Sequence, residues 1–179
     1  MTPHAAPAED PHAEIRAEVR KLCAKFPGEY WRELDSRRGY PTEFVKALTE
    51  AGWLGALIPE EFGGAGLPLS GAAAILEEIQ AAGCNGAACH AQMYIMGTIL
   101  RHGSDAQKAK YLPAIAAGEL RLQAFGVTEP TSGTDTTALR TTARREGDKY
   151  IVNGQKIWTS RAEQSDLMLL LARRPASPI

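Results

Sequence analysis

The stretch Phe125-Gly126-Val127-Thr128-Glu129-Pro130-Thr131-Ser132-Gly133-Thr134-Asp135 is followed, after a turn-rich segment, by Asn153-Gly154-Gln155-Lys156-Ile157-Trp158-Thr159-Ser160. Both parts combine small hydroxyl residues and glycines with one aromatic residue each. Hydroxyl groups, glycine turns and the backbone amides of irregular strand ends can bind a flat, polar-edged ring and its phosphates. Such turns also occur in β domains that bind no ring, so the residues alone leave both interpretations open.

The sequence around this stretch has a residue pattern typical of short strands. Apolar and polar residues alternate from Leu120, and β-type segments are predicted at 120–125, 139–143, 150–152, 157–159 and 167–171. Hairpin turns are predicted at 146–149 and at 152–155, where Asn153-Gly154 is the favoured turn pair. We therefore expect an antiparallel β meander from residue 121 onward.

The preceding part of the chain has helical periodicity instead. Apolar residues at spacings of three and four predict five helices, over about 11–26, 41–52, 70–83, 86–101 and 104–118, whereas 28–40 reads as irregular. The predicted organisation is a disordered N-terminus (1–10), an α-helical domain (11–120) and an incomplete middle β domain (121–179). The fold class is α+β, with a helical domain followed by a truncated antiparallel β domain.

Several local features of the sequence can be interpreted either as structural or as functional. Gly52 is expected to cap the second helix and Ser70 to start the third, and Glu78 is placed on a solvated face. The glycines at 63–66 are interpreted as a turn rather than a phosphate loop, since no Walker Lys-Ser/Thr follows. The helix at 86–101 changes from small to bulky residues, which fits a core helix or the wall of an apolar ligand channel, and His90 is interpreted as a packed histidine.

The composition and charge of the chain argue against several classes of function. The net charge of −1 gives no electrostatic basis for binding nucleic acid or an anionic membrane. No apolar run approaches the roughly 20 residues of a membrane helix, and the N-terminus lacks a signal-peptide core. Three cysteines without CxxC spacing and scattered histidines predict no disulfide scaffold and no metal site. A cytoplasmic location is expected.

Three motifs resemble those of one known family. Val127-Thr128-Glu129-Pro130 with Ser132-Gly133-Thr134-Asp135 is similar to the V-T-E-P-x-x-G-S-D signature of acyl-CoA dehydrogenases. Residues 148–160 resemble the second flavin-side motif of that family, and residues 58–67 match a third, upstream pattern. The resemblance covers nearly the whole chain after residue 12 and corresponds to the N-terminal half of the family. It implies a helical domain, a middle β domain and FAD bound between that β domain and C-terminal helices.

The resemblance also implies site residues. Val127 and Thr128 would face the isoalloxazine, with Thr128 near N5, and Gly133-Thr134 would lie on the pyrophosphate side. Thr134 and Ser160 replace the usual Ser and Thr, so each keeps a hydroxyl. The implied cofactor-binding set is Phe125, Val127, Thr128, Gly133, Thr134, Trp158, Thr159 and Ser160. The implied substrate set is Thr134, Ala88, Ala91, Gln92 and Ile95.

The implied reaction is α,β-desaturation of an acyl-CoA thioester, with electrons leaving to an electron-transfer flavoprotein and a homo-oligomer as the full-length assembly. The family's base is a glutamate in the C-terminal domain, which the chain is expected to lack. No catalytic residue is therefore assigned, and Glu129 has no base role in the motif. The alternatives are a non-catalytic truncated fragment that binds FAD or acyl-CoA and a flavin monooxygenase relative on the same fold.

Overall fold

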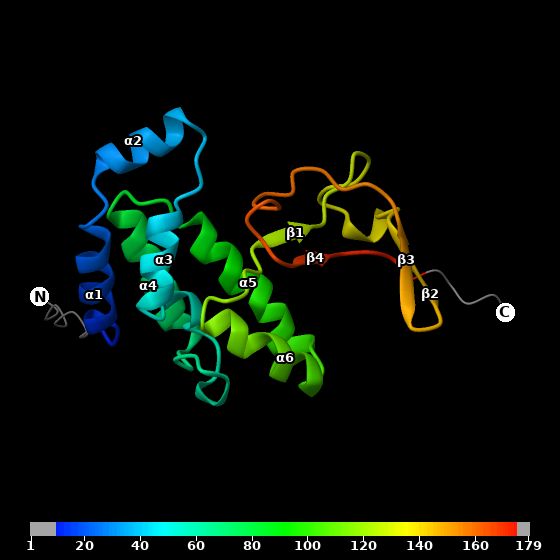
Figure 1. Cartoon of the computed structure of the whole chain (residues 1–179), viewed down its shortest axis with the longest axis horizontal. Helices are drawn as coiled ribbons and strands as arrows, with labels where there is room; N and C mark the ends of the chain where they lie inside the picture. Colours follow the sequence, from blue (N-terminus) through cyan, green and yellow to red (C-terminus); the bar gives the residue numbers. More distant parts are fainter. Residues whose placement is uncertain (1–9, 175–179) are drawn as a thin grey trace, which may run out of the picture.

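The computed structural model describes residues 10–174 and has α+β architecture. Six α-helices form one end of the molecule and the strands form the other (Figure 1). The expected disordered segment 1–10 lies, apart from Asp10, outside the described residues. The helices are α1 (Ala13–Cys23), α2 (Gly28–Ser36), α3 (Thr42–Glu50), α4 (Leu69–Ala81), α5 (Ala87–His102) and α6 (Asp105–Ala116). Short 3-10 turns occur at η1 (Trp53–Gly55), η2 (Glu60–Phe62) and η3 (Thr136–Ala138).

Helix α2 lies where an irregular segment was expected. Tyr30, Trp31 and Leu34 lie on one side of this helix at spacings of three and four, but the helix has only nine residues and only Leu34 is fully buried. Two partly buried aromatic residues also attach it to the helical core. The Trp31 ring packs edge-on against Phe44 with centroids 5.0 Å apart, and its Nε1 donates to the carbonyl of Phe26 at 3.0 Å.

Glu78 on α4 is buried rather than solvated. It is 8% exposed, and its carboxylate accepts hydrogen bonds from Arg16 at 3.5 Å and from Arg20 at 2.9 Å, both on α1. The expectation of a solvated face was wrong for Glu78, because two arginines of another helix pair with it.

The helix ends follow the sequence in most places. Gly52 has φ +78° after α3, as expected for a C-terminal glycine. Ser104 and Gln107 form a capping box at the start of α6. The prediction that Ser70 caps the third helix was wrong, because the N-cap of α4 is Pro68 and Ser70 is the second residue of the helix. The Ser70 hydroxyl instead lies 3.0 Å from Nε2 of His12.

The glycine-rich segment at 63–66 is a turn. Its amide groups are used within the chain, because Gly64 donates to the carbonyl of Pro59 and Gly66 to that of Ile58. A Cβ on Gly64 would lie 2.1 Å from the Ile58 carbonyl oxygen, so this glycine allows a close approach of two backbone segments. These contacts leave the amides of Gly64 and Gly66 unavailable to a phosphate.

Two apolar clusters form the core. The first joins α1, α3, α4 and the start of α5, and it includes Phe44, Leu48 and Ile75. The second joins the rest of α5 to α6 and to the residues leading into the strands, and it includes Ile95, Leu112 and Leu122. Helix α5 contributes to both clusters, so it positions the strand region against the helices.

The strands form two separate pairs. Strand β1 (Ala124–Gly126) pairs in parallel with β4 (Met168–Leu170), and β2 (Thr142–Glu146) pairs antiparallel with β3 (Lys149–Asn153). The hairpin turn predicted at 146–149 is confirmed. The second predicted hairpin was wrong, since residues 157–159 form no strand and the chain instead runs from Asn153 back to the end of β1.

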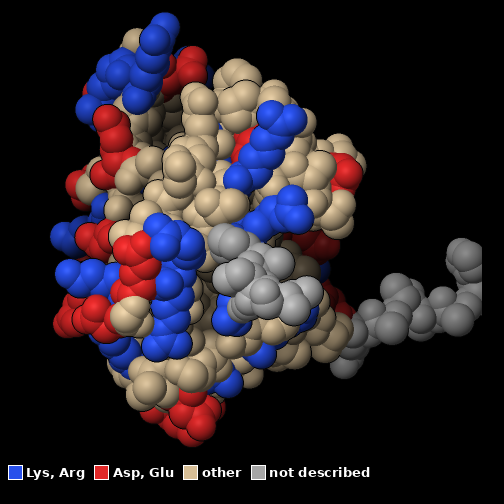
Figure 2. Space-filling view, turned by 90° about the vertical axis from the view of Figure 1, so that its right-hand side faces the viewer, with Lys and Arg blue, Asp and Glu red and all other residues tan. Residues whose placement is uncertain are grey.

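Within residues 10–174 no helix is long and apolar enough to cross a membrane. The same described residues hold no group of three or more His, Cys, Asp or Glu that could hold a metal ion. Figure 2 shows positive and negative side chains interspersed on the face at the strand end of the molecule.

Candidate functional site

A cavity of about 290 Å³ lies where β1 ends beside the segment 157–161. We call it the strand-end cavity. Its walls combine apolar side chains with three hydroxyl groups, one amide side chain and one arginine. The residues that line it are Tyr94, Gln123, Phe125, Val127, Thr128, Ile157, Trp158, Ser160 and Arg161.

Backbone and side-chain hydrogen bonds hold the two walls together. The amide of Ile157 donates to the carbonyl of Thr128 at 2.9 Å, and Nζ of Lys156 donates to the carbonyl of Val127 at 2.9 Å. Nζ of Lys156 also contacts Oε1 of Glu129 at 2.9 Å. One lysine therefore ties both motif stretches to each other.

Glu129 is the central acceptor of this arrangement. It is 4% exposed, and its carboxylate accepts from the amides of Arg140 at 2.6 Å and Thr141 at 2.8 Å in addition to Lys156. Contact with the Thr141 hydroxyl, the two amides and the Lys156 ammonium lower the pKa of Glu129 to about 2. Glu129 is therefore ionised at neutral pH and positions the backbone rather than accepting a proton.

Trp158 is held in an unusual conformation at the cavity edge. Its indole is 84% exposed, and its backbone has φ +60°, which non-glycine residues seldom adopt. Such conformations concentrate at ligand-binding sites because the surrounding structure must hold them. The residue presents a large apolar surface that no described part of the protein covers.

The polar groups of the cavity can serve the edge of a ring. The Thr128 and Ser160 hydroxyls line it, and among residues 10–174 the amides of Val127 and Thr128 donate to no protein acceptor. Apolar walls with a few convergent donors are typical of cofactor sites. These residues fit a flat heteroaromatic ring with a polar edge.

The structure brings together five of the predicted cofactor residues, namely Phe125, Val127, Thr128, Trp158 and Ser160. Thr159 is partly buried and does not line the cavity. Gly133 and Thr134 are exposed in the turn after Glu129, also outside the cavity. A Cβ on Gly133 would meet no atom within 4 Å, so that position is open to solvent.

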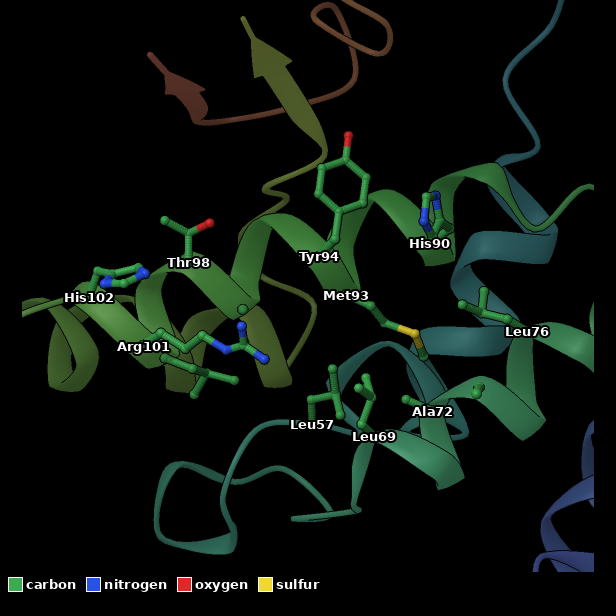
Figure 3. Close-up of a pocket in the computed structure, with 13 residues that line it drawn as sticks. Leu57, Leu69, Ala72, Leu76, His90, Met93, Tyr94, Thr98, Arg101 and His102 are labelled. Atoms are coloured by element: carbon green, nitrogen blue, oxygen red, sulfur yellow. The ribbon is translucent and has the colours of Figure 1, made fainter. Parts of the chain in front are cut away.

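A second, larger cavity of about 520 Å³ lies between α4 and α5 (Figure 3). We call it the helical cleft. In Figure 3, Met93 points between Leu76 and Ala72, whereas the Tyr94 ring points away from the cleft floor toward the strands. Tyr94 lines both cavities and packs edge-on against Phe125 with ring centroids 5.5 Å apart. Helix α5 therefore separates two neighbouring cavities with one shared tyrosine.

The four predicted substrate residues of α5 are all buried. Ala91 and Ile95 lie in the second core cluster, and Ala88 packs in the first. The side-chain oxygen Oε1 of Gln92 accepts from Nε2 of Gln123 at 3.4 Å. None of the four lines the strand-end cavity or the helical cleft, so their role in substrate binding stays a prediction.

The opposite face of α5 carries residues outside the implied substrate set. His90, Met93, Tyr94 and Thr98 line the helical cleft. His90 is exposed rather than packed, with its ring centroid 4.9 Å from that of Tyr94. The sequence could have indicated these residues. Residues at spacings of three and four share a helix face, and the most apolar face of a helix is the one that packs in the core. No periodic pattern in the sequence indicated Arg161 as a cavity-lining residue.

Two family models match the chain in sequence order. The acyl-CoA dehydrogenase N-terminal domain matches residues 9–119, and the acyl-CoA dehydrogenase middle domain matches residues 124–178. The two matches together cover both structural regions described above.

Individual relatives agree with these matches. A glutaryl-CoA dehydrogenase of Desulfococcus multivorans is 37% identical over 165 residues, covering 89% of this chain and 41% of that protein. A 3-(aryl)acrylate reductase of Clostridium sporogenes is 40% identical, covering 89% and 44% respectively. The crystal structure of an acyl-CoA dehydrogenase from Geobacillus kaustophilus has a TM-score of 0.81 at 28% identity, covering 94% of this chain and 44% of that chain. The chain thus spans less than half the length of these relatives.

Proposed function

The chain belongs to the acyl-CoA dehydrogenase family, and from this premise we propose that it binds FAD at the strand-end cavity as part of an enzyme that desaturates acyl-CoA thioesters. The observation that carries the proposal is the convergence of Phe125, Val127, Thr128, Trp158 and Ser160 on one cavity from two distant motifs. The family supplies the reaction type, and the cavity supplies the residues.

Different residues are proposed to contact different parts of the cofactor. Trp158 covers one face, because its exposed indole stands at the cavity edge. The hydroxyls of Thr128 and Ser160 and the free amides of Val127 and Thr128 bind the polar edge. Gly133 and Thr134, which lie in an exposed turn, are left for the pyrophosphate side.

When bound, the flavin supplies an acceptor for the hydride that leaves the β-carbon of a thioester. No Asp or Glu is among the described residues that line the strand-end cavity. Glu129, the nearby motif carboxylate, has a pKa of about 2 and holds Lys156 and two backbone amides. We therefore assign the removal of the α-proton to a base outside residues 10–174.

The thioester and the electron acceptor follow from the same family premise. The acyl-CoA is proposed to reach the ring beside α5, where Tyr94 joins the helical cleft to the strand-end cavity. Ala88, Ala91, Gln92 and Ile95 would support this wall from the buried side of α5. The proposed electron acceptor is an electron-transfer flavoprotein. The full-length protein is proposed to be a homo-oligomer located in the cytoplasm.

A second candidate is a fragment that binds FAD or acyl-CoA without turning the substrate over. The absence of a carboxylate from the described lining of the strand-end cavity favours this candidate for the chain acting alone. Where the fragment binds FAD, the two candidates share the flavin site and differ in whether a base is present. They can therefore be separated after flavin binding has been measured.

The test is to mix the full chain with FAD, remove free flavin by desalting and record the visible absorbance of the protein fraction. Retained flavin absorbance supports the site, and a colourless protein fraction contradicts it. Bleaching of the retained flavin by an acyl-CoA then indicates that a base is available, whereas retention without bleaching indicates the non-catalytic candidate.

A matched pair of aromatic substitutions assigns the retained flavin to the proposed cavity. Trp158→Ala should reduce flavin retention, because it removes the exposed ring at the cavity edge. Tyr150→Ala removes another exposed aromatic side chain from the same region, on β3 and outside the cavity, and should leave retention unchanged.

A further inference from the structure

A third cavity, of about 170 Å³, lies between the loop after α2, the first turn of α5 and the segment 161–164. We call it the arginine cavity. Arg38 and Arg161 line it from positions far apart in the sequence, together with Tyr40, Asn85 and Gln164. No Asp or Glu is among its described lining residues, so the cavity has an excess of positive charge.

Neither arginine has a carboxylate partner among the described residues. Within residues 10–174, Arg38 and Arg161 form no ion pair, and Nε of Arg161 is buried without a hydrogen-bond acceptor. Buried donors of native proteins almost always have a partner, so an exception calls for an explanation such as a ligand. A guanidinium group presents a planar set of donors that matches the oxygens of carboxylate and phosphate.

The backbone of both arginines is also unusual. Arg38 has φ +53° and Arg161 has φ +57°, and Trp158 is the remaining non-glycine residue with positive φ among the described residues. Arg161 lines the strand-end cavity as well as the arginine cavity. The left-handed positions therefore mark two adjoining cavities rather than scattered loops.

A third arginine lies against the ring of Tyr40. The Arg121 guanidinium lies 5.8 Å from the ring centroid and forms no ion pair within the described residues, while its backbone amide donates to Oδ2 of Asp166 at 2.7 Å. Ala87 and Ala88 of the first turn of α5 complete the lining, with Asn85 accepting from the amide of Ala87 at 2.9 Å. The start of this helix brings the positive end of its dipole to the cavity wall.

We propose that the arginine cavity binds an oxyanion, of carboxylate or phosphate type, between the guanidinium groups of Arg38 and Arg161. The shared wall at Arg161 allows two sources. The oxyanion is either a free ion or the anionic end of a larger ligand whose other part lies in the strand-end cavity. Binding of a free ion does not depend on flavin, so this proposal can fail or hold independently of the proposed function.

The first arm of the test titrates the full chain with inorganic phosphate at constant ionic strength, balanced with chloride, and follows the amide resonances of Ala87 and Ala88. We expect saturable shifts for the wild type. Arg161→Gln and Arg38→Gln should each weaken binding about tenfold, as for the loss of one charge-assisted contact. The neighbouring Arg37→Gln is the control and should bind as the wild type does, because Arg37 lies outside the cavity.

The second arm compares succinyl-CoA with butyryl-CoA, which have equal acyl length and differ in the terminal carboxylate. Saturation by phosphate assigns the cavity to a free oxyanion. Tighter binding of succinyl-CoA than of butyryl-CoA, lost in Arg161→Gln, assigns it to the end of a larger ligand. Either result supports the proposal. It is overturned if neither probe binds in an Arg161-dependent way, or if Arg37→Gln weakens binding as much as Arg161→Gln does.

Discussion

Nζ of Lys156 lies 2.9 Å from Oε1 of Glu129, and the two side chains are only 9% and 3% exposed. Glu129 belongs to the first motif stretch and Lys156 to the second, so this buried ion pair fixes their separation at the strand-end cavity. Breaking one side of a buried pair leaves the other charge without compensation, which is strongly destabilising.

We expect Glu129→Gln to lower the melting temperature by several degrees and to change the pH dependence of stability. The folded-state pKa of Glu129 is lowered from 4.5 to about 2. Its ionised form therefore contributes stability that is fully present above pH 4.5 and is lost as the pH falls toward about 2. Unfolding measured across this window should be less pH-dependent in the variant.

The control for this prediction is Glu119→Gln, which changes an exposed carboxylate without an ion pair in the described structure. It should follow the wild-type pH curve. An equal slope for wild type and Glu129→Gln would mean that the pair does not hold the two motifs together.

Trp158→Ala should separate binding from stability. The indole is 84% exposed, so we expect the free energy of unfolding to change by less than about 0.5 kcal/mol. Flavin affinity should fall about tenfold, because aromatic stacking and apolar contact are removed. Denaturant unfolding and flavin titration measure the two effects, and a stability loss as large as the affinity loss would contradict this role.

Substitution by alanine should have different effects on the two faces of α5. Ile95 is fully buried, so Ile95→Ala should cost about 2–5 kcal/mol in urea unfolding. Tyr94 is 40% exposed and lies at the junction of the two cavities, so Tyr94→Ala should cost less and weaken acyl-CoA binding more. The reverse order would assign the substrate wall to the face of Ala91 and Ile95.

Gly154 should tolerate no side chain. It has φ +155°, and a Cβ there would lie 2.3 Å from Oγ1 and 2.6 Å from Cα of Thr141. Gly154→Ala should therefore destabilise the protein by about 2 kcal/mol or more and impair flavin binding. Gly133→Ala is the matched control, since the site is open, and should change stability by less than about 0.5 kcal/mol. Equal effects would contradict the close approach at Gly154.

Local signals in the sequence predicted much of the helical region. The spacing of Ile15, Val19 and Leu22 corresponds to the buried side of α1, and Ser104 before Asp105 marked the start of α6. Helix α2 was missed although Tyr30, Trp31 and Leu34 have helical spacing, because it has only nine residues and most of the others are charged. Over so short a segment, periodicity could not distinguish a helix from an irregular segment.

Long-range pairing accounts for the remaining differences. The parallel pairing of Ala124 with Met168 depends on how the intervening chain returns, which no local pattern encodes. Asn153-Gly154 was interpreted as a hairpin turn because the pair is typical of one. Here Gly154 serves a close contact with Thr141 instead, and the chain continues to the strand-end cavity.

The candidate site was predicted as a set of motif residues rather than as a shape. Five of the eight cofactor candidates converge. Gln123, Ile157 and Arg161 flank them in sequence, whereas Tyr94 joins them only through tertiary structure. The small residues Ala88 and Ala91 suggested a channel wall, but small apolar residues also suit the buried side of a helix, and the structure places both in the core.

The most direct test of the central claim is a backbone amide spectrum of the full chain titrated with FAD. If the two motif stretches form one flavin site, the largest shifts should fall together on Val127, Thr128, Trp158 and Ser160, with little change at Ala91 and Ile95. Shifts confined to one stretch, or absent from both, would contradict the claim.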